Sequence, residues 1–279
     1  MIGGSHLDIN SHGQAVDNTG GTLTSSGTLG IASGDLTNQG GAIGANGTLN
    51  IQSGVIDNSQ NGQIVGQSTL GLSASRLNNT GGQIQSRGDA TINTGTGSVD
   101  NTAGLLRSAG SLIVNSGALI NDQTTGQDQG LQANAMVLNP ASLSNRQGQI
   151  VANQDVVVTT GGVVDNTQGI ISAANNLTLQ DLAATKTQAI TNTAGQLVSG
   201  NSLTMNTASL TGDGQILSQQ DISVSLTTDL TQSGKIIGNR NVTVATSGSV
   251  SNSGPIEAGN TLTLTAGNNL SNEATGTIA

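Results

Sequence analysis

A repeat of about twenty residues runs along the chain. An aliphatic residue, followed two places later by a polar turn residue, recurs in steps of 20 to 26 residues at Val16, Leu36, Ile56, Leu77, Val99, Leu119, Leu143, Val164, Ile190, Leu210, Leu230, Val250 and Leu270. A short fixed period indicates that each repeat is one structural unit, which cannot bury its apolar face without its neighbours. The sequence therefore predicts a solenoid rather than a globular domain.

One repeat, residues 36–54, shows the local pattern. Leu36, Ile43, Leu49 and Ile51 lie in short stretches that alternate apolar and polar residues, as strands with one buried face do. Gly-Gly, Asn-Gly and Ser-Gly dipeptides separate these stretches and are typical of turns. We therefore expect an all-β fold: a right-handed parallel β-helix of about thirteen coils, with roughly 20 residues and three short strands per coil.

A polar column accompanies the three apolar ones. It consists of Asn18, Asn38, Asn58, Asn79, Asn101, Asn121, Asn145, Asn166, Asn192, Asn252 and Asn272. Asparagine tolerates left-handed backbone and can hydrogen-bond its own chain, and stacked amides can form a ladder. We interpret the column as structural. Gly212 and Gln232 replace Asn in two coils, so the ladder should weaken there.

The composition narrows the class of protein. The 279 residues include 41 Gly and no Cys, Phe, Tyr or Trp, and the net charge is −9. An interior without rings must be thin and aliphatic, which suits a narrow tube, and the regular spacing of apolar residues argues against disorder. An acidic surface without aromatic residues argues against nucleic acid as a partner. No apolar run is long enough for membrane insertion.

The repeat pattern also suggests the domain organisation. Residues 1–12 are interpreted as a probable expression-vector remnant with a partial first coil, and no signal peptide is recognisable. Residues 13–279 are expected to form a single continuous β-helical repeat domain. The steps from Leu119 to Leu143 and from Val164 to Ile190 are 24 and 26 residues, which places insertions near 121–130 and 180–189.

The pattern L-x-N-x-G-G-x-I-x-A-x-G-x-L-x-L-x-x-G resembles the filamentous haemagglutinin repeat and covers the chain from about Val16 to Ile278. This repeat occurs in the shafts of two-partner secretion exoproteins, which include adhesins and effectors of contact-dependent growth inhibition. The resemblance implies a right-handed parallel β-helix that is secreted to, or tethered at, the surface of a Gram-negative bacterium. It also implies an outer-membrane β-barrel transporter as a partner.

The sequence contains no recognisable combination of catalytic residues. The two histidines, His6 and His12, lie near the start of the chain, and the carboxylates are scattered. Gly212-Asp213-Gly214 is similar to part of the calcium-binding nonapeptide repeat, but it occurs once and the repeat itself is absent from the sequence. The sequence predicts no enzyme, no catalytic residue, no cofactor and no metal site.

Two features are candidates for binding. Arg87, Gly88 and Asp89 form an Arg-Gly-Asp tripeptide, which is either an adhesive motif or an ordinary turn that requires glycine. The insertions are either neutral loops or contact sites, because binding residues often lie on loops that leave a regular scaffold. The candidate contact residues in the insertions are Thr124, Gln127, Asp128, Thr185, Lys186 and Thr187.

The sequence thus leaves three functional hypotheses. The first is a structural shaft that projects a distal adhesive or toxin module. The second is a segment that binds a host-cell or neighbouring-bacterium receptor through its inserted loops. A carbohydrate-active β-helix is a distant third, because its clustered acids and sugar-binding aromatic or basic residues are missing.

Overall fold

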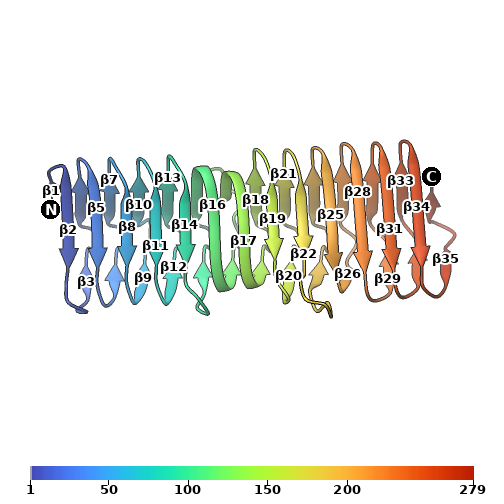
Figure 1. Ribbon diagram of the computed structural model, residues 1–279, viewed down its shortest axis with the longest axis horizontal. Coiled ribbons are helices and arrows are strands. Elements are labelled where there is room, and N and C mark those ends of the chain that lie inside the picture. The colour runs from blue at the N-terminus through green and yellow to red at the C-terminus, as the bar shows by residue number, and fades with distance from the viewer. Residues whose placement is uncertain (1) are drawn as a thin grey trace. The chain divides into compact units, whose positions relative to one another are not determined.

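The computed structural model describes residues 2–279 and has no helix within them. Parallel strands stack as a β-solenoid of about 14 turns with successive turns ~20 residues apart, which confirms the predicted all-β parallel solenoid (Figure 1). The chain divides into two compact units, Met1–Ala141 and Ser142–Ala279, called unit 1 and unit 2 below. Each unit is described by itself.

Unit 1 repeats three strands in each coil. The first column contains β3 (Val16–Asp17), β6 (Leu36–Thr37), β9 (Val55–Asp57), β12 (Arg76–Asn78) and β15 (Val99–Asp100). The second contains β1 (Ile2–Gly3), β4 (Thr22–Ser25), β7 (Ala42–Ala45), β10 (Gln63–Gly66) and β13 (Gln83–Ser86). The third contains β2 (His6–Asn10), β5 (Thr28–Ala32), β8 (Leu49–Gln52), β11 (Leu70–Ser73) and β14 (Ala90–Asn93). Equivalent residues pair between coils, as Ile64 does with Ile43 and Ile84.

Unit 2 follows the same order. Its first column contains β20 (Val163–Asp165), β23 (Ala189–Thr191), β26 (Ser209–Thr211), β29 (Leu230–Gln232), β32 (Val250–Asn252) and β35 (Leu270–Asn272). The second contains β18 (Gln149–Ala152), β21 (Ile170–Ala173), β24 (Gln196–Ser199), β27 (Gln215–Ser218), β30 (Lys235–Gly238), β33 (Pro255–Ala258) and β36 (Thr277–Ile278). The third contains β19 (Val156–Thr159), β22 (Leu177–Gln180), β25 (Ser202–Thr207), β28 (Asp221–Leu226), β31 (Asn241–Thr246) and β34 (Thr261–Ala266).

Two strands depart from the predicted three per coil. β16 (Leu105–Ile120) is one continuous strand that pairs with β13, β14 and β15 in turn, and β17 (Gly130–Ser144) is similarly long. The prediction of three short strands is wrong for these coils. The corners of β16 contain the small residues Ala109, Gly110 and Gly117, which let the chain bend while it stays extended.

The start of the chain contributes to the first coil. Residues 2–10 form β1 and β2, which pair in parallel with β4 and β5. The interpretation of residues 1–12 as a vector remnant concerns their origin and stays a prediction.

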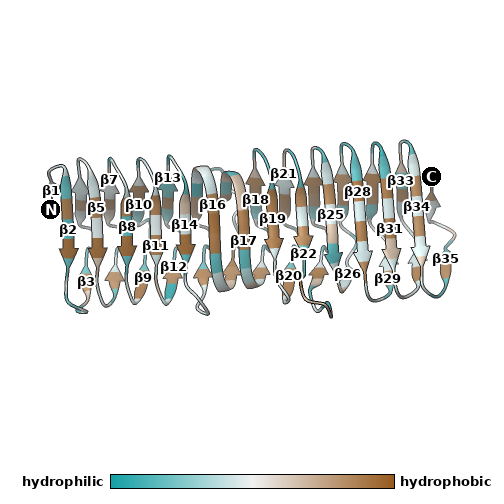
Figure 2. Ribbon diagram, in the orientation of Figure 1, coloured by the Kyte–Doolittle hydropathy of each residue, from teal (hydrophilic) through white to brown (hydrophobic). Residues whose placement is uncertain are grey.

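The core of each unit is a stack of aliphatic side chains. The inward apolar residues of the three columns are buried from Leu23 to Ile256, with Ile64 in unit 1 and Leu177 in unit 2 both fully inaccessible. In the last coil they are not, and Leu270 has 48% of its surface exposed. Hydrophobic colouring concentrates on the strands, and polar residues gather at the turns (Figure 2). Because each coil contributes only a few side chains, the interior is one residue thick between facing sheets, as the ring-free composition predicts.

The Asn column forms hydrogen-bonded ladders inside both units. In unit 1 the side-chain amide nitrogens of Asn18, Asn38, Asn58, Asn79 and Asn101 each donate to the side-chain oxygen of the next Asn, at 2.7–2.8 Å. In unit 2 Asn145 donates to Asn166 and Asn166 to Asn192, both at 2.8 Å. Nearly all of these side chains are buried, so the ladder is a polar part of the core.

Left-handed backbone lies beside the ladder rather than in it. Among the described residues, positive φ occurs two positions after the ladder Asn, as at Gly40 (φ 59°) and Ala103 (φ 53°), and at none of the ladder residues themselves. The ladder asparagines themselves thus do not use the left-handed conformation that Asn tolerates. Asn is required instead because its short amide reaches both the next coil and the carbonyl oxygen three residues on, as Asn79 does with Gly82.

The first-column sheet of unit 2 is interrupted between β26 and β29. β29, β32 and β35 form a sheet of their own, and among the described residues no hydrogen-bonded pairing joins β26 to β29. The ladder is interrupted at the same level, where Gly212 and Gln232 replace Asn. Gln232 is 3% exposed and its Nε2 has no partner, nor does Oδ1 of buried Asn252 in the next coil. The predicted weakening of the ladder is confirmed.

This interruption leads to a first prediction. Replacing Gln232 by Asn should stabilise the protein by about 1 kcal/mol, because Nδ2 could donate to the unpaired Asn252 Oδ1. Asn252 lies in a turn of the same length and already makes this bond to Asn272, at 2.8 Å, so the shorter side chain fits. Urea unfolding measures the effect, with Gln232→Leu as the control that leaves Asn252 unpaired. A Gln232→Asn protein less stable than the parent would contradict the assigned geometry.

Candidate functional site

The first lengthened connection, residues 121–129 between β16 and β17, folds back onto unit 1. Thr124 is fully buried and its hydroxyl donates to the carbonyl oxygen of Asn121, at 3.1 Å. Gln129 accepts from the Gly126 N–H at 2.9 Å and donates to the carbonyl oxygen of Ala103, in the preceding coil, at 3.0 Å. Thr124 is therefore a packing residue of the loop and offers no contact surface.

The outer part of this loop carries the other two candidate residues. Gln127 and Asp128 are both exposed. The Asp128 carboxylate pairs with the Arg107 guanidinium, at 2.5 Å from Nη2 to Oδ1, and Arg107 Nε also donates to Gln132 Oε1 at 3.0 Å. The Asp128 carboxylate is thus paired within unit 1, and Gln127 is the residue of the two that is better placed to contact a partner.

The second lengthened connection, residues 181–188 between β22 and β23, is organised by one carboxylate. Asp181 is 3% exposed and accepts N–H groups from Thr187 (2.7 Å), Ala183 (2.9 Å) and Gln188 (3.1 Å). These hydrogen bonds, that from Thr187 above all, lower the pKa of Asp181 from 3.8 to about 2. The loop wraps around a buried anion, which the sequence analysis did not identify.

The candidate residues of this loop mostly hold it together. Lys186 Nζ donates to the carbonyl oxygens of Asp181 and Ala183, and Thr187 Oγ1 donates to the carbonyl oxygen of Gly161 at 2.7 Å. Thr185 is exposed, and Leu182 beside Asp181 has 70% of its surface in solvent. The available surface of the loop is therefore apolar and hydroxylic rather than cationic.

The Asp181 cluster makes the loop sensitive to acid. Because the folded-state pKa lies below the ordinary value, the stabilisation is present above about pH 4 and is lost as the pH falls through about 2. We expect the Thr187 amide to lose its protection against hydrogen exchange, and to shift in NMR spectra, over this interval. Asp181→Asn should abolish that transition, whereas an unchanged transition in Asp181→Asn would assign it to another group.

The Arg-Gly-Asp tripeptide lies at the corner between β13 and β14. Arg87 and Asp89 are exposed, and Asp89 Oδ1 accepts the N–H of Ser111, in the next coil, at 2.8 Å. A Cβ at Gly88 would lie 2.6 Å from the carbonyl oxygen of Ser68 in the preceding coil, so stacking requires glycine there.

Other corners use the same carboxylate device. Asp35 accepts from the Val55 N–H at 2.8 Å, and Asp229 from the Ser249 N–H at 2.7 Å, each reaching one coil further along the chain. This recurrence supports the structural interpretation of Asp89. An adhesive role for the tripeptide stays a prediction.

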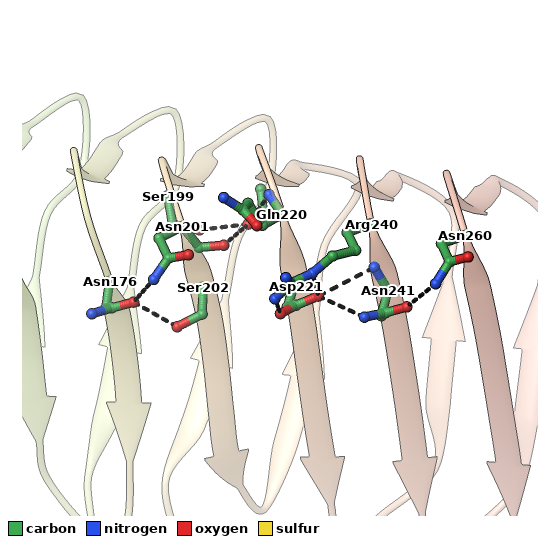
Figure 3. Close-up of polar contacts among 10 residues, drawn as sticks. Asn176, Ser199, Asn201, Ser202, Gln220, Asp221, Arg240, Asn241 and Asn260 are labelled. Carbon is green, nitrogen blue, oxygen red and sulfur yellow. Dashed lines mark hydrogen bonds and ion pairs between the residues drawn. The ribbon is translucent and has the colours of Figure 1, made fainter.

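The corners between the second and third columns of unit 2 form the densest polar network (Figure 3). Asn176 Oδ1 accepts from Asn201 Nδ2 at 2.9 Å and from Ser202 Oγ at 2.7 Å. Asn176 also donates through Nδ2 to Asp155 Oδ1, at 2.9 Å. These contacts tie three successive coils together at their edge.

The same network continues around Asp221. Its carboxylate makes two hydrogen bonds with the Arg240 guanidinium and accepts Asn241 Nδ2 at 3.0 Å, while Asn241 Oδ1 accepts from Asn260 at 2.9 Å (Figure 3). The Arg240 contact is the main cause that lowers the pKa of Asp221 to about 2. The carboxylates of the network, Asp155 and Asp221, both accept hydrogen bonds from the following coil. The network therefore links successive coils.

Within residues 2–279 no group of three or more His, Cys, Asp or Glu side chains is placed to hold a metal ion. Nor do these residues include a helix long and apolar enough to cross a membrane. His6 contacts the Asp8 carboxylate at 2.7 Å and the Thr28 hydroxyl, both on exposed side chains.

A parallel β-solenoid with buried amide ladders and carboxylates tied to coil edges defines a β-solenoid repeat protein. The haemagglutinin repeat family model matches residues 5–59, 52–98, 87–139, 128–201 and 198–278. The chain therefore belongs to the haemagglutinin repeat family, which confirms the resemblance drawn from the sequence. Comparison with curated proteins and with solved structures found no match.

Proposed function

We propose that this chain is the shaft segment of a large secreted or surface-tethered bacterial exoprotein, which projects a distal adhesive or toxin module. The observation that carries the proposal is the match of the family's repeat along the chain together with strand-for-strand stacking within each unit. In such an array each coil contacts only its neighbours, so length can grow without a new core.

The polar chemistry of the coils supports a mechanical role. Carboxylates such as Asp89, Asp181 and Asp221 accept hydrogen bonds from backbone or side-chain groups of the chain itself. Buried Asn side chains add bonds directed from coil to coil. These groups resist separation of the coils, which is what a projecting element needs.

Export fits the same architecture. Passage through an outer-membrane β-barrel transporter of the two-partner type delivers an unfolded chain, and each coil can then fold on the one before it. The absence of Cys in the 279 residues would avoid cross-linking in an oxidising compartment. The proposed location is the exterior of a Gram-negative outer membrane.

The test is a replacement of the shaft in the exoprotein that carries it. Substituting residues 13–279 by an unrelated β-solenoid with the same number of coils should leave adhesion or toxin delivery unchanged. A version shortened by unit 2 should reduce either activity by reducing reach. Loss of activity in the equal-length replacement would show that this segment itself binds, and the spacer role would be rejected.

The second candidate, direct receptor binding through the inserted loops, rests on Leu182 and Gln127. Both are exposed on loops that leave the repeat, and Leu182 is the most exposed large apolar residue after Ile2. Leu182→Ser and Gln127→Ala should weaken attachment of labelled protein to target cells if the loops bind. Val163→Ser, at an exposed apolar residue of β20 outside the loops, is the matched control.

A further inference from the structure

The outer face of the third-column sheet in unit 1 is hollowed by a trough of about 540 Å³. Its floor is the backbone of β2, β5, β8 and β11, which lie side by side (Figure 1). One rim consists of Asp8, Gly30, Asn50, Gly71 and Thr91, and the other of Asn10, Ala32, Gln52, Ser73 and Asn93. The trough crosses the strands, so it extends about 20 Å along the stack at ~4.8 Å per strand.

Glycine shapes the first rim. A Cβ at Gly30 would lie 2.5 Å from Asp8 Oδ1, and a Cβ at Gly71 would lie 2.6 Å from Asn50 Oδ1. Each glycine therefore makes room for the side-chain oxygen of the preceding coil. Polar groups consequently recur at every second coil, at Asp8, Asn50 and Thr91, with a spacing of about 10 Å.

Much of this polar surface has no partner inside the chain. Among the described residues, the side chains of Asn50, Gln52 and Thr91 make no hydrogen bond within the chain, and all three are exposed. In β5, β8 and β11 the backbone N–H and C=O groups pair with a coil on each side. A ligand that lies across these three strands therefore meets no free backbone edge, and its recognition must use the amide, hydroxyl and carboxylate groups of the rims.

The charges restrict the ligand further. Among the described residues that line the trough, Asp8 alone is charged and none is Lys or Arg. The net charge of the chain is −9. An acidic polymer would meet repulsion without a compensating cation. The lack of aromatic residues removes stacking, which leaves hydrogen bonds to a ligand dense in hydroxyl or amide groups.

From this geometry we infer that the trough binds an uncharged, extended β-linked hexose or N-acetylhexosamine chain that lies across the strands. In such a polymer each sugar advances by nearly one coil spacing and alternate sugars face the same way, which matches polar groups at every second coil. Amides on both rims, such as Asn50 and Gln52, can both donate to and accept from hydroxyl or acetamido groups. Without stacking each contact is weak, and affinity comes from repetition along the trough. This inference is independent of the shaft proposal.

The experiment is NMR titration of the full chain with chitohexaose and with cellohexaose. We expect saturable shifts confined to amides of β5, β8 and β11, and none with polygalacturonate, which is anionic. Binding of cellohexaose alone identifies a hexose chain as the ligand, and binding of chitohexaose alone identifies an N-acetylhexosamine chain. Equal binding of both means that the trough recognises the ring hydroxyls that the two polymers share. No shift with either neutral sugar overturns the inference.

Two variants locate the binding. Gly71→Leu adds bulk to the trough at a position where a Cβ would meet only the Asn50 side chain, and Asn50→Ala removes a rim group without adding bulk. Both should weaken binding at least tenfold, with circular dichroism unchanged. Gly44→Leu, which faces outward from the neighbouring sheet at β7, is the control and should bind normally. Equal binding by Asn50→Ala and the parent, or concentration-dependent dimerisation that Gly71→Leu abolishes, would reject a glycan occupant.

Discussion

Leu177→Ala is expected to lower the free energy of unfolding by about 3 kcal/mol. Leu177 lies in β22, is fully buried, and pairs in register with Val156 in the coil before and Leu203 in the coil after. Removing its side chain leaves a cavity that a core one residue thick cannot fill by rearrangement. The effect should therefore equal or exceed that of a typical buried leucine.

Thr178 provides the matched control, because it is adjacent in the same strand and faces outward. Thr178→Ala should change stability by about 0.5 kcal/mol or less. Urea unfolding followed by far-ultraviolet circular dichroism measures both variants. Similar losses at the two positions would contradict the assigned inner and outer faces of β22.

The apolar columns show why the fold could be predicted from the sequence. Residues such as Ile43, Ile64 and Ile84 stand at a constant offset, and strand alternation fixes which of them point inward. A parallel stack requires like residues to lie over like, so periodicity alone determines the register. The Asn ladder follows from the same argument, because Asn58 and Asn79 occupy equivalent positions.

The candidate sites were less predictable for a physical reason. Periodicity identifies where a loop leaves the repeat, but it does not reveal which of its polar groups are consumed internally. Thr124 and Lys186 are polar residues on insertions and therefore candidate contact residues, yet both make hydrogen bonds within their own loops. Asp181, which organises the second loop, has no signal in the repeat.

The trough was missed for the complementary reason. Gly30 and Gly71 lie within strands, where the sequence pattern gives glycine no particular role. They shape the trough because a side-chain oxygen from the preceding coil, of Asp8 or Asn50, lies where their Cβ would be. A hollow made by residues about 20 apart appears only when the coils are stacked.

Gly82→Ala is the second substitution for which we expect a large effect, about 3 kcal/mol or more. A Cβ at this position would lie 2.0 Å from the carbonyl oxygen of Asn58, in the coil before, and 2.6 Å from Asn79 Oδ1. The first contact is with backbone, so the two coils must separate. Separation would also stretch the 2.8 Å ladder bond from Asn58 to Asn79.

The preceding residue, Gly81, separates crowding from backbone conformation. Gly81 has φ +64° and open space around its Cβ position, so Gly81→Ala costs only the left-handed conformation of alanine, about 1–2 kcal/mol. Ala103 and Gln60 already adopt this conformation at the equivalent place in other coils. Paired unfolding experiments should therefore rank Gly82→Ala well below Gly81→Ala in stability, and NMR signals of the Asn58 side-chain amide should change only in Gly82→Ala. The reverse order would mean that conformation, rather than the close approach of successive coils, accounts for the glycine pairs at 20–21, 40–41 and 81–82.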